Sequence, residues 1–144
     1  MPIELIAPHG GTLINRLLPA DQQEAAHERA AALPQVVLTE ANLADLEMIA
    51  TGGLSPLTGF MQQADYDSVV HTLRLANGLP WSIPVTLAVE GAFADTLKEG
   101  QQVALVEKTE AGTTTLLAIL TVEQKYPYSK EDEAQNVYRT TEIA

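Results

Sequence analysis

The sequence predicts an α+β fold with its helices mainly in the N-terminal half. Apolar residues recur at helical spacing before residue 74, and from residue 83 onward the apolar pattern changes to the alternation typical of strands. Helices grouped ahead of strands are typical of α+β domains. Because 46% of the 144 residues are hydrophobic, the chain can build one core, and we expect one domain over residues 1–144.

The first half of the chain contains two helices with clear boundaries. A loop leads into a short strand expected at residues 12–14. Asp21 and Glu24 resemble a capping pair at the start of an alanine-rich helix. Thr39 is placed to cap the next helix, which we expect to end at Gly52, since glycine readily adopts the left-handed conformation there.

A third helix and the strands follow. Residues 66–73 carry apolar side chains at positions i, i+3, i+4 and i+7, which predicts an amphipathic helix. Residues 83–89 alternate and predict a strand, which Pro84 places at the edge of a sheet or at a bulge. Residues 103–107 and 113–122 predict a hairpin turning at Gly112, and the second strand is apolar on both faces, so we expect it to be central in a barrel-like sheet.

The charge balance disfavours a nucleic-acid partner. Nineteen acidic and eight basic residues give a formal net charge of -11, whereas proteins that bind duplexes usually present a cationic face. The chain has no cysteine and no apolar run long enough to span a bilayer, and its start does not resemble a signal peptide. We therefore expect a cytoplasmic protein without a membrane partner.

The glycine-rich stretch GGLSPLTGFM at residues 52–61 predicts a packed corner. It lacks the Lys-Ser/Thr ending of a phosphate-binding loop and follows a helix instead of a strand. The segment around Ser55 lacks the final glycine of the G-x-S-x-G motif that forms a nucleophile elbow. Pro56 fixes the turn, and the apolar side chains nearby are suited to burial. They are Leu54, Leu57, Phe60 and Met61.

The three histidines form no metal-binding pattern. His27 and His71 lie on expected helices without a second histidine one turn away, and a lone histidine is a weak indication of chemistry. His9 lies in the flexible PHGG stretch with Gly10 and Gly11, where a loop-closing or interface role is favoured over catalysis.

Four blocks resemble the N-terminal region of ATP sulfurylase (sulfate adenylyltransferase). They are PHGGTLINR at 8–16, DLEMIATGGLSPLTGFM at 45–61, WSIPVTL at 81–87 and LAILTVEQKYPYSKEDEAQNVYRTTE at 117–142. The resemblance implies a PUA-like mixed pseudo-barrel. It also implies a parent enzyme that converts ATP and sulfate to adenosine 5′-phosphosulfate and pyrophosphate with magnesium, the activating step of sulfate assimilation.

The family's nucleotide- and sulfate-binding motifs do not occur in this chain. They are a glutamine-arginine-asparagine-histidine segment and a glycine-arginine-aspartate-histidine loop, both in the domain that follows. We therefore assign no catalytic, cofactor-binding or metal-binding residue here and expect an inactive scaffold that packs on the catalytic domain. Arg139 and Glu142 stand where the family often has glycine and aspartate. The structural or interdomain candidates are His9, Gly10, Gly11, Gly52, Gly53, Ser55, Pro56, Leu57, Gly59, Phe60 and Met61.

Two other functions stay open at the level of sequence. PUA-like folds elsewhere bind RNA, although the net charge of -11 argues against that here. The chain could also be a free-standing regulatory or assembly subunit, which the gene sequence after Ala144 would decide.

Overall fold

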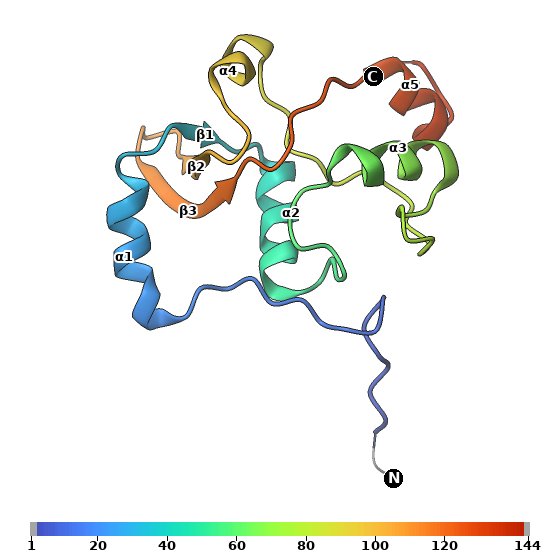
Figure 1. Ribbon diagram of the computed structural model, residues 1–144, viewed down its shortest axis with the longest axis horizontal. Helices are drawn as coiled ribbons and strands as arrows, with labels where there is room; N and C mark the ends of the chain where they lie inside the picture. The colour runs from blue at the N-terminus through green and yellow to red at the C-terminus, as the bar shows by residue number, and fades with distance from the viewer. Residues whose placement is uncertain (1–2, 143–144) are drawn as a thin grey trace. The chain divides into compact units, whose positions relative to one another are not determined.

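The computed structural model describes residues 3–142, which form two compact units. Among the described residues, unit 1 comprises residues 3–59 and 103–120, and unit 2 comprises residues 60–102 and 121–142. Helices and a small sheet are both present, which confirms the α+β prediction, with three of the helices before residue 73. Figure 1 shows the order of these elements along the chain.

Unit 1 is built around a three-stranded sheet in the order β1-β2-β3. Strand β1 (Gln35–Val37) pairs in parallel with β2 (Gln102–Lys108), with Val36 opposite Leu105. Strand β3 (Thr114–Thr121) follows β2 through the predicted hairpin, in which Gly112 has a φ of 84°. The four residues 103–106 of β2 are at most 1% exposed and form the centre of the core.

The predicted position of β3 is wrong, because β3 is an edge strand and β2 is central. Both strands are apolar on both faces, so that pattern alone could not rank them. Strand β2 is central because β1 pairs with the side of β2 that does not face β3. As a consequence Leu117 of β3 stays 37% exposed.

Two helices accompany the sheet in unit 1. Helix α1 (Ala20–Ala30) places Ala30 against Ala104 and Val106 of β2. The capping pair predicted at its start is wrong, because the N-cap is Pro19 and no side chain caps the helix. Helix α2 (Glu40–Thr51) begins as predicted, with the Thr39 hydroxyl accepting a hydrogen bond from the Asn42 amide at 3.2 Å.

Unit 2 contains α3 (Gln63–Thr72), whose buried stripe is Tyr66, Val69 and Val70. The helix was predicted to include Leu73, but Leu73 is the C-cap with a φ of 57° and is 40% exposed. Its carbonyl accepts a hydrogen bond from the Trp81 amide at 2.9 Å, so the chain turns back earlier than the apolar spacing predicted.

Residues 83–89 form no strand, so the edge strand predicted there is wrong. Only Val85 is buried, at 2% exposure, and Ile83 is 49% exposed. The alternating pattern suggested that a whole face of the segment is buried, but in the structure only one side chain of that face, Val85, is buried. Helix α4 (Gly91–Thr96), which was not predicted, follows.

The C-terminal part of unit 2 is helical. Ser129 caps α5 (Lys130–Glu133), because its hydroxyl accepts a hydrogen bond from the Asp132 amide at 3.2 Å. The helix then widens into a π-helical turn, η1 (Ala134–Tyr138), which ends at Arg139 in the left-handed conformation with a φ of 60°.

Candidate functional site

The stretch of residues 52–61 was the main candidate, and its first glycine is tightly enclosed. Gly52 ends α2 with a φ of 92°. A Cβ atom there would lie 2.7 Å from Leu13 Cδ1 and 2.9 Å from the Ile14 carbonyl oxygen. Glycine is therefore required both for the left-handed turn and for the close approach of residues 13–14. Gly53 faces Met48, with a Cβ distance of 3.3 Å to Met48 Cε.

Ser55 holds residue 14 against this turn. Its hydroxyl donates to the Gly52 carbonyl at 2.7 Å and accepts from the Ile14 amide at 2.8 Å. Ser55 is 5% exposed. The hydroxyl thus donates to one backbone group and accepts from another, and within residues 3–142 no basic side chain is bonded to it. This geometry is typical of a structural serine and not of a nucleophile.

The remaining residues of the stretch differ in burial. Leu57 in unit 1 is 6% exposed, while Gly59 has open space where a Cβ would lie. Pro56 follows a cis peptide bond and is half-buried, as is Phe60. Met61 in unit 2 is 5% exposed.

Met61 is fixed by its backbone. Its amide donates to the Val85 carbonyl at 2.8 Å, and its carbonyl accepts from the Tyr126 hydroxyl at 2.6 Å. The Val85 amide in turn donates to Met61 Sδ at 3.5 Å. Met61 thereby joins two segments of unit 2 that are far apart in the sequence.

The PHGG stretch is an exposed turn. The Gly11 amide donates to the Pro8 carbonyl at 2.8 Å, and Gly10 and Gly11 have φ values of 79° and 91°. His9 is exposed. A Cβ on Gly11 would meet no atom within 4 Å, so this turn needs its glycine for the backbone conformation and not for space.

Three tyrosines gather on α3 and the segment before α5. The Tyr66 ring centroid lies 5.6 Å from that of Tyr126 and 6.3 Å from that of Tyr128, and its hydroxyl donates to Glu133 Oε2 at 2.7 Å. Burial and the hydrogen bond to Glu133 raise the pKa of Tyr66. Burial, with nearby carboxylates led by Asp67, raises the pKa of Tyr126 to about 12. Both hydroxyls are thus neutral donors near pH 7, suited to structural hydrogen bonds.

A second polar link joins α3 to α5. His71 Nε2 lies 3.1 Å from Asp132 Oδ2, and Nδ1 lies 2.8 Å from the Asp67 carbonyl oxygen. Among residues 3–142, no group of three His, Asp or Glu side chains could hold a metal ion, and no helix is long and apolar enough to cross a membrane.

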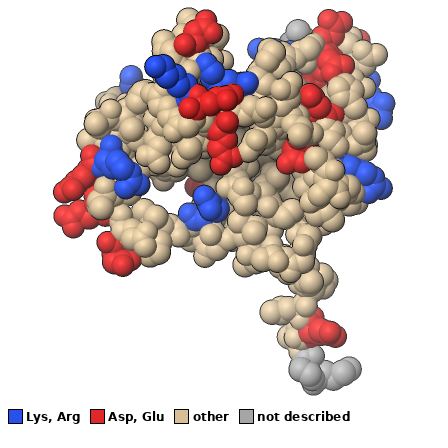
Figure 2. Space-filling view, viewed as in Figure 1, with Lys and Arg blue, Asp and Glu red and all other residues tan. Residues whose placement is uncertain are grey.

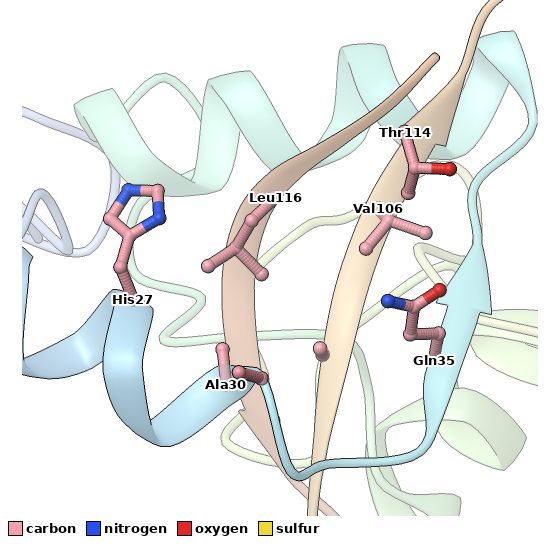
Figure 3. Close-up of a pocket in the computed structure, with 8 residues that line it drawn as sticks. His27, Ala30, Gln35, Val106, Thr114 and Leu116 are labelled. Atoms are coloured by element: carbon pink, nitrogen blue, oxygen red, sulfur yellow. The ribbon is translucent and has the colours of Figure 1, made fainter. Parts of the chain in front are cut away.

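Unit 1 contains an open hollow of about 200 Å³ between α1 and the sheet. Figure 3 shows His27 on α1 and Gln35 on β1 at its two sides, with Leu116 and Val106 between them. The eight lining residues are His27, Ala30, Ala31, Gln35, Ala104, Val106, Thr114 and Leu116. None of the eight is Lys, Arg, Asp or Glu, so the lining supplies neither a cation for phosphate nor a carboxylate for Mg²⁺.

The family described as PUA-like domain matches residues 6–144. The chain belongs to the PUA-like domain family. This agrees with the fold that the resemblance implied.

The PUA-like domain is also similar to parts of larger enzymes. Sulfate adenylyltransferase of Acaryochloris marina is 49% identical over 140 residues, which are 97% of this chain and 35% of that protein. The sulfate adenylyltransferases of Synechococcus elongatus and Symbiobacterium thermophilum are 51% and 50% identical over 95% and 96% of this chain, and each is covered to 34%. The resemblance to sulfate adenylyltransferase is therefore confirmed, and the chain spans about a third of the length of these relatives.

A solved structure is similar to this PUA-like domain as well. It is described as the hexameric APS kinase from Thiobacillus denitrificans, with a TM-score of 0.67 and 40% identity over 81% of this chain and 23% of that one.

The sequence patterns located the turns of this PUA-like domain but did not predict which distant residues these turns contact. The structure brings Gly52 and Ser55 together with Leu13 and Ile14, and it places His9 in a separate exposed turn. No local pattern indicates that Ser55 bonds to a residue 41 positions away. The tyrosine cluster was also missed, although the closely spaced Tyr126 and Tyr128 could have indicated an aromatic contact.

Proposed function

We propose that this PUA-like domain is the N-terminal domain of a sulfate adenylyltransferase, that it occupies residues 1–144 as a single domain, and that it serves as a scaffold for a catalytic domain that follows it. The observation that carries the proposal is about 50% identity over nearly the whole chain to sulfate adenylyltransferases, of which the chain covers about a third. The alternative of a free-standing subunit has no comparable support.

In this proposal the parent enzyme joins ATP and sulfate to form adenosine 5′-phosphosulfate and pyrophosphate, with magnesium. A site for that reaction must stabilise phosphate and sulfate charge, usually with basic side chains or backbone amides. The hollow of unit 1 lacks charged lining residues, and the Ser55 hydroxyl is used by its own backbone neighbours. ATP and Mg²⁺ do not fit these residues, so we assign them to the catalytic domain.

The candidate residues then have structural or contact roles. Gly52, Ser55 and Leu57 hold the corner of unit 1, and Met61 holds two segments of unit 2. The exposed turn at His9 and its two glycines is accessible to a neighbouring domain.

We further propose that the domain binds neither nucleic acid nor membrane and acts in the cytoplasm, where ATP is available. The net charge of -11 supports the first part. Figure 2 shows acidic and basic side chains interspersed over the face drawn, without the broad basic patch that an RNA-binding surface usually presents.

The test begins with the gene beyond codon 144. The proposal predicts an open reading frame that continues into a longer domain with basic and histidine-containing nucleotide-binding motifs. The full-length protein should release pyrophosphate from ATP in a sulfate-dependent reaction with Mg²⁺, and the 144-residue chain should not. A stop codon after Ala144, or sulfate-dependent pyrophosphate release by the chain alone, would contradict the proposal.

A further inference from the structure

The N-terminal segment, residues 3–18, exposes an unusual amount of apolar surface. Six large aliphatic side chains are 42–96% exposed, namely Ile3, Leu5, Ile6, Leu13, Leu17 and Leu18. Figure 1 shows the segment in blue as a coil that runs past the end of α2 to the start of α1. Contiguous exposed apolar surface on a folded protein usually marks an interaction site, whereas single exposed side chains do not.

The N-terminal segment is also nearly free of charge. Only Glu4 and Arg16 carry a formal charge, although the whole chain contains 27 charged side chains, 19 acidic and 8 basic. In Figure 2 the corresponding stretch at the bottom is mostly tan. Depletion of charged residues is typical of the buried centre of protein interfaces.

Part of the segment is held in place by hydrogen bonds. The Ile14 amide donates to Ser55 Oγ at 2.8 Å, and the Arg16 amide donates to the Ala50 carbonyl at 2.9 Å. Leu13 and Leu17 flank these anchored positions and are each 59% exposed. Because the backbone between them is bound to α2 and the turn after it, these leucines are presented on a fixed surface and are not side chains of a loose end.

We propose that the N-terminal segment is the docking surface for the polypeptide that follows this domain in the full-length enzyme, and that it contacts an apolar, uncharged face of that polypeptide. The proposal rests on the proposed function. The chain covers 34–35% of its curated relatives, so those proteins contain roughly twice as much additional polypeptide, enough to supply such a face.

Side-chain footprinting with a carbene reagent tests the docking directly. The full-length protein and the 144-residue chain are labelled at equal low concentration, and the labelling of Leu5, Ile6 and Leu17 is compared. We expect roughly tenfold lower labelling of Leu5 and Ile6 in the full-length protein, because these side chains pass from 86% and 96% exposed to buried, and a smaller decrease for Leu17, which starts at 59% exposed. Leu17→Asp in the full-length protein should restore the labelling of Leu5 and Ile6. The matched control Ile83→Asp changes an apolar side chain of unit 2 that is 49% exposed, and should not restore it.

Two labelling results would overturn the docking proposal. Equal labelling of the three residues in both proteins would show that the segment stays uncovered. Labelling that is already low in the 144-residue chain and increases on dilution would identify a second copy as the occupant. The proposed function fails separately, if the full-length protein forms no adenosine 5′-phosphosulfate; a gene that ends after codon 144 removes the occupant and overturns both.

Discussion

The two glycine pairs of unit 1, Gly10–Gly11 and Gly52–Gly53, look alike in the sequence but differ in the structure. Gly11 and Gly52 have nearly the same φ, 91° and 92°. A Cβ on Gly11 would meet nothing within 4 Å, whereas one on Gly52 would lie 2.7 Å from Leu13 Cδ1. The first pair forms an exposed turn, and the second forms a packed joint to a distant segment. A glycine pair in the sequence therefore predicts a turn. Whether that turn also packs against a distant segment depends on the atoms around it in the folded structure.

Leu57→Ala should have the largest effect on the joint. Leu57 is 6% exposed in the stretch after Gly52, so its truncation should lower the free energy of unfolding by about 2–5 kcal/mol in a urea melt. In the same melt of the 144-residue chain, the matched change Leu17→Ala, at a leucine that is 59% exposed there, should change it by less than about 0.5 kcal/mol. Phe60→Ala should fall between them, because that ring is only half-buried. Equal losses of unfolding free energy in the Leu57 and Leu17 variants would show that the stretch after Gly52 is no more tightly packed than the exposed N-terminal region.

A comparison of Gly52→Ala with Gly11→Ala isolates the steric effect of the atoms that surround Gly52. Both changes force alanine into the left-handed region, at a cost of about 1–2 kcal/mol. Gly52→Ala must also displace the Ile14 carbonyl oxygen at 2.9 Å, which should add about 1–3 kcal/mol. Thermal melts of the two variants should therefore differ clearly, with the Gly52 variant less stable. If both lose the same stability, the approach of residues 13–14 is looser than described.

Arg139 extends the comparison to a left-handed backbone position that is occupied by a residue other than glycine. It has a φ of 60° after the π-helical turn, where the resembling family often has glycine. Arg139→Gly should be about 1 kcal/mol more stable than Arg139→Ala, since only glycine adopts this conformation without steric cost. Denaturant melts of the two variants provide the measurement. Equal stability would indicate that residue 139 is not held in the left-handed region.

The sequence predicted what depends on neighbours within one turn of chain. The Thr39 cap, the end of α2 at Gly52 and the hairpin turn at Gly112 were all predicted correctly. Each depends on a hydrogen bond or a φ angle set by residues a few positions away. Local rules also failed where the chain turned early, as at Leu73.

What the sequence could not predict depends on distant partners. The strand expected at residues 12–14 is absent, because the Ile14 amide bonds to a serine side chain instead of a neighbouring strand. The central position predicted for β3 was wrong, because the pairing of β1 with β2 is a long-range contact. The candidate residues were found as turns, but their partners Ile14, Val85 and Tyr126 were not.

The central claim is that the groups that hold nucleotide and sulfate lie outside this PUA-like domain, and ATP binding tests it most directly. Isothermal titration of the 144-residue chain with ATP and Mg²⁺ should show no saturable heat up to millimolar nucleotide, while the full-length protein should bind. Saturable binding of ATP by the 144-residue chain would contradict the account.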